Sequence, residues 1–203
     1  DNCLKNKNLL LDVDIKKIDK KNKTLITDKN HKIKYDFLIS TTNIDDLHNY
    51  KYGKLNYAGY DIEAKIIKKK DAYTLDNKEI SMLYFPEKKY KHCRITNYGS
   101  FQKKKGFPYD THTILTIEKP NNNVRLYPTL DKKNTDLFKK YLFETAKHKD
   151  IISFGRLGLY KYLTSDTTIE MAFRLRKYIS TWKKMSTSKR VLAYEKIRGG
   201  WNN

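Results

Sequence analysis

The sequence predicts a mixed fold of the α+β or α/β kind, in which antiparallel sheets precede a helix–strand–helix segment. Three patterns indicate it: apolar and polar residues alternate over residues 9–40, strand-like runs return over residues 56–119, and helical spacing dominates residues 134–182. With 203 residues, 38% of them hydrophobic, the chain can bury a core in one domain or in two small ones.

The first region, residues 9–40, is predicted to form a small β-meander. The run LLLDVDIKKID alternates apolar and polar side chains, and NKTLITDKNHKIKYD adds two short strands about an Asp-Lys-Asn turn. FLIS then completes the region as the end of a buried strand, and TTNIDDL leaves the sheet. Residues 56–119 are predicted to form a second antiparallel sheet. Its strand-like runs are YAGYDIEAKII, EISMLYFP, HCRITNYGSF and THTILTIEK.

Two helices and a strand are predicted near the C-terminus. Apolar residues recur at helical spacing over 134–148, with Asn134 or Thr135 as the N-cap. IISFG follows as a buried strand. The run SDTTIEMAFRLRKYISTW is the second helix, which Ser165 or Asp166 can cap. The basic remainder from residue 183 shows no clear periodicity.

Composition excludes several classes of function. The formal charge of +20 invites a nucleic-acid-binding role, but the excess is lysine with only seven arginines, spread along the chain, so nucleic acid is an unlikely partner. Cys3 and Cys93 provide neither a disulfide framework nor a zinc spacing, so we expect no metal and a reducing, cytoplasmic location. No apolar run approaches membrane-spanning length, and no Gly-rich phosphate loop occurs.

One short run, FGRLGLYKYLTSD at residues 154–166, carries the strongest functional signal. A strand, then Gly155 and Arg156, then a loop and a helix start would offer backbone N–H groups and positive charge to an anionic group. The local residues leave an alternative open. Arg156 could instead cap the carbonyl groups of a neighbouring helix, with the two tyrosines in the core.

The same run resembles the C-terminal flavin-binding signature of the UDP-galactopyranose mutase family. Three further runs resemble segments of that family in the same order. They are KIKYDFLISTTNIDDL, CRITNYGSF and RLYPTLDKKNTDLFKKYLFETAKHKDIISFGR. Together the four matches cover most of residues 10–180. The sequence is therefore identified as similar to the mutase-like, FAD-dependent flavoproteins of the amine oxidase-like superfamily.

The resemblance implies the C-terminal portion of a two-domain FAD flavoprotein. Residues 1–44 would be the β-meander part of the FAD-binding domain, and residues 45–120 the antiparallel sheet of the substrate-binding domain. Residues 121–182 would return to the FAD-binding domain with the Gly-Arg motif and the C-terminal helix, and residues 183–203 would be a basic tail.

The activity implied by the resemblance is an isomerase of polysaccharide biosynthesis. It would interconvert the pyranose and furanose forms of a UDP-sugar, using reduced FAD as a covalent catalyst without net redox change. A reduced flavin carries negative charge, which a helix N-terminus would stabilise by roughly 0.3 to 1 kcal/mol.

The resemblance also implies site residues. Arg156 would be catalytic, and Arg94, Tyr127 and Tyr162 would bind the substrate diphosphate, for which arginine provides paired donors. FAD would be bound by residues of the meander and of the Gly-Arg motif, namely Ile15, Gly155, Arg156, Gly158, Ser165, Asp166 and Thr167. Structural alternatives stay open for the other groups: Arg94 in a cross-strand ion pair, both tyrosines in core packing, and Ser165 with Asp166 as a helix cap.

Two departures from the family pattern bear on function. Bacterial mutases usually have aspartate where this chain has Thr164, which leaves the sugar open. The family's Gly-rich dinucleotide motif has no counterpart here, so we expect a truncated chain, a separate N-terminal half, or a non-catalytic remnant. The alternatives are an FAD-dependent oxidoreductase acting on another substrate and a basic nucleic-acid-binding module. A homo-oligomer is possible, and no membrane partner is expected.

Overall fold

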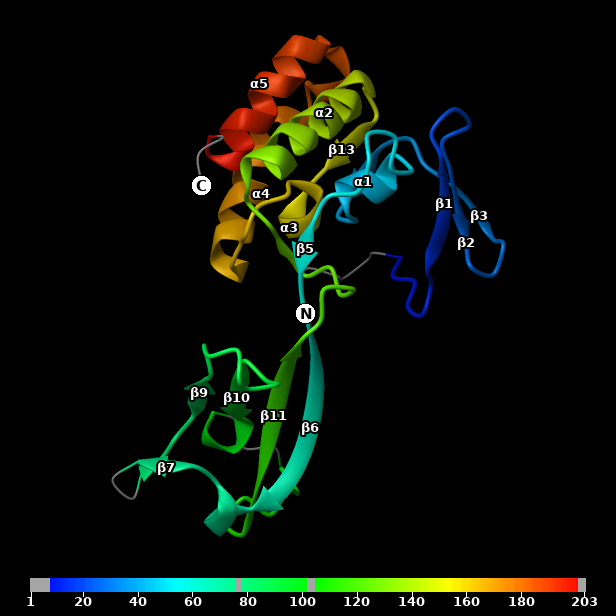
Figure 1. Ribbon diagram of the computed structural model, residues 1–203. Coiled ribbons are helices and arrows are strands. Elements are labelled where there is room, and N and C mark those ends of the chain that lie inside the picture. The colour runs from blue at the N-terminus through cyan, green and yellow to red at the C-terminus, as the bar shows by residue number, and fades with distance from the viewer. Residues whose placement is uncertain (1–7, 76–77, 102–104, 201–203) are drawn as a thin grey trace. The chain divides into compact units, whose positions relative to one another are not determined.

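A computed structural model describes residues 8–75, 78–101 and 105–200, which divide into two compact units. Unit 1 comprises Asp1–Leu55 and Leu130–Asn203, and unit 2 comprises Asn56–Thr129. The colours of Figure 1 show that blue and red segments, from opposite ends of the chain, build unit 1. The central part of the chain builds unit 2.

The elements of unit 1 are, in order, β1 (Ile15–Asp19), β2 (Thr24–Thr27), β3 (Lys32–Lys34), β4 (Leu38–Ser40), α1 (Ile44–Leu47), α2 (Lys132–Lys147), β13 (Ile151–Ser153), α3 (Gly155–Gly158), α4 (Ser165–Ile179), the 3-10 turn η4 (Trp182–Lys184) and α5 (Thr187–Arg198). Those of unit 2 are β5 (Tyr57–Ala58), β6 (Tyr60–Lys68), η2 (Lys69–Asp71), β7 (Thr74–Leu75), β8 (Lys78–Glu79), β9 (Met82–Tyr84), β10 (Arg94–Asn97), η3 (Tyr98–Ser100), β11 (His112–Pro120) and β12 (Tyr127–Pro128).

The unit boundaries lie about ten residues beyond the predicted ones. The carboxylate of Asp45 accepts a 3.0 Å hydrogen bond from the backbone N–H of Leu55, and α1 is buried against unit 1, so this stretch stays with unit 1. The backbone N–H of Asn121 donates to the carbonyl of Gly59, and β12 pairs with β5, which keeps the return segment in unit 2. The first shift follows from a hydrogen bond between residues ten apart, and the second from pairing between residues about sixty apart.

The predicted β-meander is present as the antiparallel sheet β1–β2–β3. It is shorter than the alternation suggested, because Leu9, Leu10 and Leu11 lie outside any strand and are 57–71% exposed. The prediction that FLIS belongs to this meander is wrong. Its strand β4 pairs in parallel with β13, from the other end of the chain, in a two-stranded sheet.

Helix α2 begins earlier than predicted. Asp131, not Asn134 or Thr135, is its N-cap, and its carboxylate accepts from the backbone N–H of Asn134 at 2.7 Å. An aspartate at this position satisfies one of the N–H groups that a helix start leaves without an intrahelical acceptor. Helix α2 buries Phe138 and Tyr141 completely.

Helix α4 begins at the predicted residue, but its cap differs. Thr164 is the N-cap, and its hydroxyl and that of Thr167 form a reciprocal capping box. Ser165 and Asp166 are therefore the first two helical residues and not the cap. The helix ends at Ile179, before the predicted end at Trp182, which begins the turn η4.

The basic tail, for which the sequence showed no clear periodicity, contains a helix that was not predicted, because residues 187–198 form α5. Its buried face carries Ala193, Tyr194 and Ile197 together with two buried arginines, Arg190 and Arg198. Charged residues at core positions broke the apolar periodicity on which the prediction rested. Residues 201–203 of the predicted tail lie outside the described residues.

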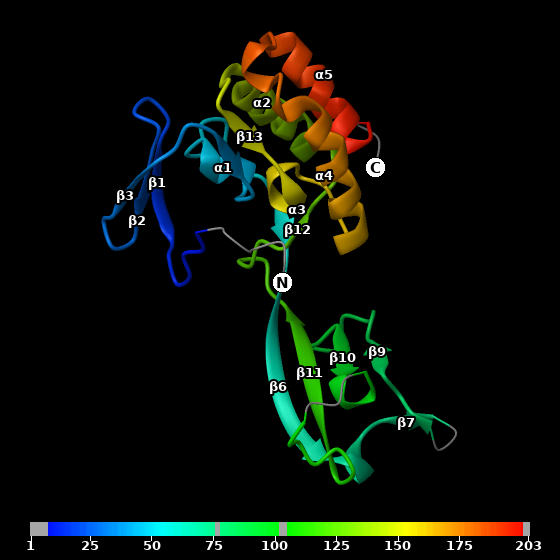
Figure 2. The ribbon, with the colours of Figure 1, turned by 180° about the vertical axis from the view of Figure 1, so that it is seen from behind.

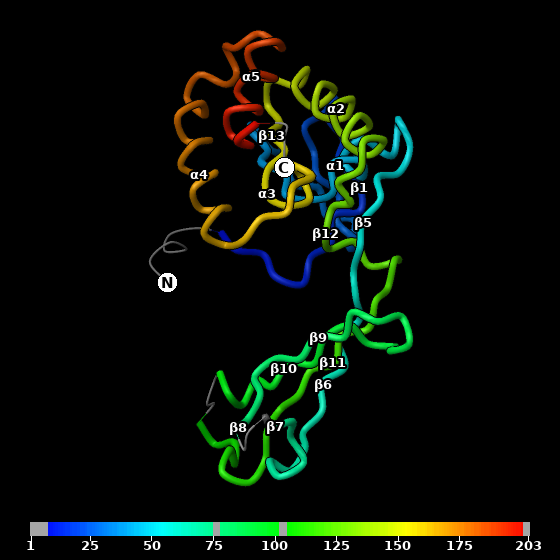
Figure 3. The backbone as a smooth tube through the Cα atoms, turned by 60° about the vertical axis from the view of Figure 1, so that its left-hand side comes forward, coloured from blue at the N-terminus to red at the C-terminus, as the bar shows by residue number. Residues whose placement is uncertain are grey.

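The core of unit 1 lies among α2, β13 and α5, which run side by side in Figures 1 and 2. Figure 3 shows α2 and α4 on either side of β13 and α3. The largest fully buried side chains here are Trp182, Tyr141, Tyr160, Tyr194 and Phe138. Two of these rings contact the region where the Gly-Arg motif begins: the Tyr194 hydroxyl bonds to Ser153 at the end of β13, and Phe138 stacks on Tyr160 of the motif.

Unit 2 contains the predicted second antiparallel sheet, in the strand order β6–β11–β10–β9. Strands β6 and β11 pair over nine residues each, from Tyr60 opposite Pro120 to Lys68 opposite His112. Strand β10 then places Arg94 opposite Glu118 of β11 and opposite Tyr84 of β9. The register therefore decides which side chains accompany Arg94.

Candidate functional site

The Gly-Arg motif begins where β13 ends, and its two glycines have structural causes. Gly155 has φ of +78°, a backbone conformation that side-chain-bearing residues rarely adopt. At Gly158, an added Cβ would lie 2.8 Å from the hydroxyl oxygen of Ser153 and 3.2 Å from the carbonyl oxygen of Ser40. Gly158 thus allows α3 to pack closely on β4 and β13. The positive φ of Gly155 and this packing of Gly158 explain both residues without a ligand.

Arg156 is held by the loop that follows it. Its Nε and Nη2 atoms donate to the carbonyl oxygen of Leu163 at 3.2 and 2.6 Å. The guanidinium also lies over the ring of Tyr162, 5.2 Å from its centre, a distance at which a cation attracts an aromatic face. Tyr162 is 55% exposed, so the alternative of core packing is wrong for this tyrosine.

The loop turns sharply at Tyr160, the buried tyrosine of the motif. Its φ is +45°, and left-handed backbone at such a residue costs on the order of 1–3 kcal/mol. The Tyr160 ring is fully buried and stacks on Phe138 with 5.7 Å between ring centres. Burial of this ring offsets the backbone cost, and the turn leaves the next tyrosine, Tyr162, at the surface.

The start of α4 presents polar groups to solvent. Ser165 and Asp166 are exposed, and the first N–H groups of a helix have no intrahelical acceptor. The pKa of the Asp166 carboxyl is lowered, chiefly by a hydrogen bond with the Thr164 side chain and then by backbone N–H groups. This carboxylate is therefore kept ionised beside Thr164 and Thr167.

Ile15, the predicted cofactor residue of the meander, lies at the start of β1 and is 40% exposed. It lines a cavity of about 320 Å³ together with residues of β1, of α1 and of the segments before and after α1, among them Lys17, Thr42, Asp46 and Tyr50. Cavities of this size are at the lower end of those that hold small ligands. No sequence pattern indicated the α1 side of this cavity.

In unit 2, Arg94 forms the cross-strand ion pair that the sequence left as an alternative. Its Nε and Nη2 atoms donate to one carboxylate oxygen of Glu118 at 2.8 and 2.6 Å. Glu118 is 5% exposed, whereas the Arg94 side chain is 28% exposed. The hydrogen bond to Glu118 raises the pKa of Arg94 further above its usual value. The pair fixes the direction of a guanidinium that still reaches solvent.

Tyr127 is brought close to Arg94 through a residue that the sequence did not indicate. The hydroxyl groups of Tyr127 and Tyr60 lie 3.1 Å apart, and the centre of the Tyr60 ring lies 6.0 Å from the Arg94 guanidinium carbon. The hydrogen bond with Tyr127 is the main cause that raises the pKa of Tyr60 to about 12. Tyr84, 5.8 Å from the same carbon, completes this aromatic surrounding.

The predicted residues thus form three separate groups. Arg156 and Tyr162 lie together in unit 1, beside the loop that leads into α4. Ile15 lies at the meander cavity of the same unit. Arg94 and Tyr127 lie together in unit 2. Sequence reasoning missed the partners of the last group, namely Tyr60, Tyr84 and Glu118. Only the strand register could have identified them.

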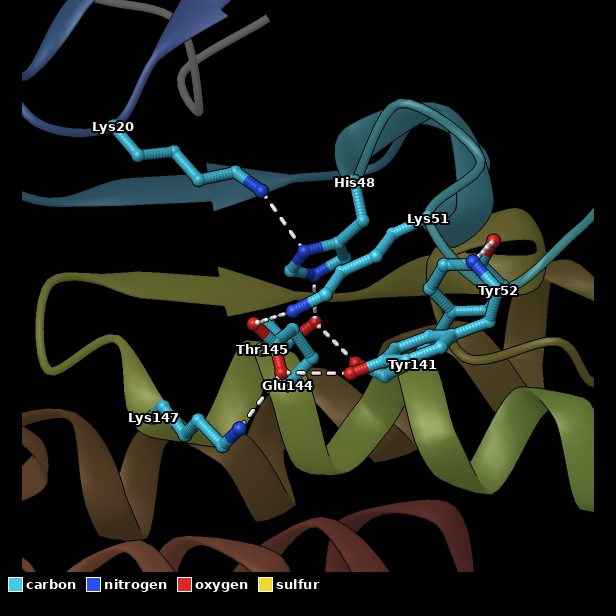
Figure 4. Close-up of polar contacts among 8 residues, drawn as sticks. All are labelled: Lys20, His48, Lys51, Tyr52, Tyr141, Glu144, Thr145 and Lys147. Atoms are coloured by element: carbon cyan, nitrogen blue, oxygen red, sulfur yellow. Dashed lines mark hydrogen bonds and ion pairs between the residues drawn. The ribbon is translucent and has the colours of Figure 1, made fainter.

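A second polar cluster joins the meander to α2 and contains none of the predicted residues (Figure 4). The Lys20 ammonium contacts Nδ1 of His48 at 2.9 Å, and His48 Nε2 contacts the Thr145 hydroxyl at 2.7 Å. Since an ammonium can only donate, Nδ1 accepts and Nε2 carries the proton. Burial, followed by the charge of Lys20, lowers the pKa of His48 to about 3. His48 is therefore a neutral structural link.

Beside this link, Glu144 of α2 holds three side chains. Its carboxylate accepts from Lys51 at 2.9 Å, from the Tyr52 hydroxyl at 3.0 Å and from Lys147 at 2.8 Å. The hydrogen bonds with Lys147 and Lys51 are the main causes that lower its pKa to about 2. The cluster ties the segment after α1 to α2.

Neither a metal nor a membrane feature is found in the part of the chain that the structure describes. Within residues 8–75, 78–101 and 105–200, no three His, Cys, Asp or Glu side chains are placed to share a metal ion. None of the helices in these ranges is both long and apolar enough to cross a membrane.

Comparison with known proteins identifies the family. The family model described as UDP-galactopyranose mutase matches residues 1–162, which include the motif from Gly155 to Tyr162. The chain belongs to the UDP-galactopyranose mutase family. The family resemblance seen in the sequence is therefore confirmed.

Two curated members of this family are similar to the chain over part of their length. The UDP-galactopyranose mutase of Mycoplasma genitalium is 30% identical over 133 residues, which cover 64% of this chain and 32% of that protein. A probable UDP-galactopyranose mutase of Klebsiella pneumoniae is 28% identical over 137 residues, covering 64% and 33%. The chain thus spans about a third of the length of these curated members of the mutase family.

A solved structure confirms the fold class. The crystal structure of a reduced UDP-galactopyranose mutase superposes with a TM-score of 0.67 and 19% identity, over 92% of this chain and 49% of that one. The mixed α/β architecture with antiparallel sheets is therefore the architecture of part of a mutase. These comparisons do not favour the oxidoreductase or the nucleic-acid-binding alternative.

Proposed function

We propose that the chain is part of a mutase-like enzyme that interconverts the pyranose and furanose forms of a UDP-sugar with reduced FAD. The observation that carries this proposal is the joint occurrence of the family match and a half-buried Arg156 that contacts the exposed Tyr162 next to the start of α4. In this proposal unit 1 contributes to the FAD-binding domain and unit 2 to the substrate-binding domain.

The residues of unit 1 fit a flavin in two respects. The start of α4 offers N–H groups without an intrahelical acceptor, and the ionised Asp166 carboxylate can accept from hydroxyl groups of a cofactor. The motif residues Gly155 and Gly158 would act by shaping the backbone, and Ser165 and Thr167 by forming this helix start. The cavity at Ile15 would take another part of the same FAD molecule.

Reduced FAD, when bound, would supply the nucleophile that makes and breaks the bond to the anomeric carbon. The chain itself would bind and orient. Arg156 is the proposed catalytic residue because its guanidinium, a planar delocalised cation, is fixed by Leu163 and Tyr162. A fixed positive charge next to a reacting group stabilises negative charge that develops there.

The proposed diphosphate site of unit 2 is built on Arg94. Glu118 accepts from two nitrogen atoms of the guanidinium, which orients the rest of the fork of five donors toward an anion. Tyr127 would donate its hydroxyl to the same diphosphate from its place beside Tyr60. Tyr162, exposed in unit 1, is the third proposed substrate-binding residue.

The parallel pair of β4 and β13 supports a further partner. Parallel sheets are normally covered on both faces and comprise more than two strands, whereas Ile39 in the middle of β4 is 44% exposed. We propose that additional parallel strands, provided by a further segment or a separate N-terminal half, cover this side. Those strands would bring the Gly-rich motif that this chain does not contain.

Flavin binding tests this function directly. The chain would be purified alone and together with whatever coding sequence lies directly upstream, and the visible absorbance of each product would be recorded after incubation with FAD. We expect flavin absorbance in the longer product, and conversion of a UDP-pyranose to its furanose isomer only after reduction. Flavin in neither product would contradict the proposal.

Matched variants sharpen this test. Arg94→Lys should weaken UDP binding without removing flavin, because Arg94 lies in the unit proposed to bind substrate. Arg156→Lys should weaken both. Arg174→Lys, at an exposed ion pair with Glu170 on α4, is the control for a general effect of replacing a guanidinium by an ammonium and should leave both unchanged. Equal effects of all three variants would oppose the assigned roles.

A further inference from the structure

The last residue of α5, Arg198, is buried against the Gly-Arg motif. It is 3% exposed, and its Nε and Nη2 atoms donate to the carbonyl oxygens of Leu159 and Tyr160 at 3.2 and 3.4 Å. Its Nη1 donates to the carbonyl oxygen of Gly200 at 2.8 Å. The guanidinium therefore joins the end of α5 to two consecutive carbonyl groups of the motif loop.

The contact is reciprocal. The Lys161 ammonium, from the same loop, donates to the backbone carbonyl oxygen of Arg198 at 3.0 Å. The backbone N–H of Lys161 in turn donates to the carbonyl oxygen of Arg156 at 3.1 Å. The loop from Leu159 to Lys161 is thus bonded to α5 on one side and to Arg156 on the other.

One residue of this loop, Tyr160, has a backbone conformation that surrounding contacts must stabilise. Tyr160 has a left-handed backbone, and its ring stacks on Phe138 of α2. The Arg198 guanidinium lies over the same Phe138 ring, 5.4 Å from its centre. Backbone in a sparsely populated region persists when its surroundings fix it, and Arg198 bonds directly to the carbonyl of that residue.

We propose that Arg198 is a positioning residue for the site. It acts through the Leu159–Lys161 loop, whose left-handed turn sets the places of Arg156 and Tyr162. Helix α5 begins at Thr187, beyond residues 1–162 to which the family model applies. The consequence for catalysis rests on the proposed function, whereas the ordering of the loop does not.

Arg190 provides a matched control on the same helix. It is 6% exposed, and it donates to the carbonyl oxygens of Trp182, Ala146 and Met185. Both arginines are therefore buried and satisfied by backbone carbonyls, but those of Arg190 belong to α2 and to the turn around η4. If Arg198 had only a general structural role, replacing either arginine by lysine should affect the Leu159–Lys161 loop equally.

Amide hydrogen exchange, followed by mass spectrometry on the full chain, separates the two roles. Arg198→Lys cannot reproduce the forked donation. It should speed exchange in a peptide covering residues 155–164, where the amides of Leu159 and Lys161 are hydrogen-bonded, by roughly tenfold. In a peptide from α2, exchange in Arg198→Lys should increase no more than it does in Arg190→Lys. Equal acceleration of the 155–164 peptide in both variants would overturn the proposal.

A second variant covers the case in which Arg198→Lys does not fold. Lys161→Met removes the reciprocal bond from a partly exposed position, and faster exchange of the 155–164 peptide is expected here too. Unchanged exchange in this variant would count against the proposal.

The functional consequence has its own measurement. In the flavin-binding form of the protein, Arg198→Lys should lower kcat and raise KM, because the loop places both Arg156 and the substrate-binding Tyr162, while Arg190→Lys should keep both constants. Faster loop exchange, with no flavin bound by either the chain alone or the longer product, would refute the proposed function and leave the positioning role intact. An unchanged kcat in Arg198→Lys would overturn the catalytic part of the inference.

Discussion

The guanidinium carbon of Arg156 lies 5.2 Å from the centre of the Tyr162 ring, while the same side chain donates twice to the carbonyl of Leu163. The loop between them therefore closes on its own arginine. A charged group fixed in this way is oriented before any ligand binds, which reduces the entropy lost on binding.

Arg156→Lys tests this orientation. A lysine ammonium is a point charge that cannot donate twice to one carbonyl from a planar fork, so the loop should lose its fixed closure. We expect flavin affinity to fall about tenfold, and the free energy of unfolding to fall by about 1–2 kcal/mol. Flavin titration and urea unfolding measure the two changes. If Arg156→Lys kept full flavin affinity, a positive charge at this position would be enough for flavin binding and the fixed orientation of the guanidinium would not be needed.

Glu118→Gln tests the buried ion pair of unit 2. Glutamine keeps the shape but leaves Arg94 without its ionised partner, so we expect a loss of about 1–3 kcal/mol in the free energy of unfolding. Glu63→Gln is the control, because Glu63 pairs with Lys65 and Lys119 at exposed positions and should contribute less than about 1 kcal/mol. Equal losses in the two variants would mean that burial of Glu118 adds nothing.

His48 predicts a dependence of stability on pH. Its pKa in the folded chain is lowered to about 3, against about 6.5 for an unperturbed histidine, so between these values the unfolded chain binds the additional proton. Stability should therefore fall as pH decreases below 6.5. The loss between pH 6.5 and 5 should be about 1–2 kcal/mol, since one proton contributes at most about 1.4 kcal/mol per pH unit.

His48→Gln should flatten this part of the profile. The groups that face His48 are Lys20, Lys51, Glu144 and His148, and burial lowers the pKa of His148 as well, so a smaller slope should remain. His31→Gln, at an exposed position beside β3, is the control and should keep the parental slope. Thermal unfolding at pH 5, 6 and 7 measures the three proteins. An unchanged slope in His48→Gln would rule out His48 as its source.

Tyr194→Phe tests the link between α5 and β13. The Tyr194 hydroxyl accepts a 2.9 Å hydrogen bond from the backbone N–H of Ser153, and both residues are fully buried. Phenylalanine keeps the edge contact with Trp182 but leaves this N–H without an acceptor, which should cost about 1–3 kcal/mol in the free energy of unfolding. Chemical unfolding gives the value, and Tyr98→Phe, at a 44% exposed ring, should be close to neutral.

Sequence patterns succeeded where local periodicity and burial coincide. The antiparallel sheet of unit 2 and the helices α2 and α4 each follow an apolar repeat that matches their geometry. They failed at α5, where Arg190 and Arg198 occupy core positions, and at β4, whose partner β13 lies more than a hundred residues away. Neither a buried arginine nor a parallel pairing with a distant strand produces an apolar repeat in a short stretch of sequence.

For the site, the sequence by itself determined the residue types and their order: a Gly-Arg turn, two tyrosines and a polar helix start, with Arg94 and Tyr127 upstream. The tertiary structure decided their partners. Register placed Glu118 opposite Arg94, the pairing of β12 with β5 placed Tyr127 beside Tyr60, and the packing of α5 placed Arg198 on the motif loop. The physical reason is that a motif specifies local backbone geometry, whereas charge pairing and the support of a strained turn depend on chain segments that meet only in the folded molecule.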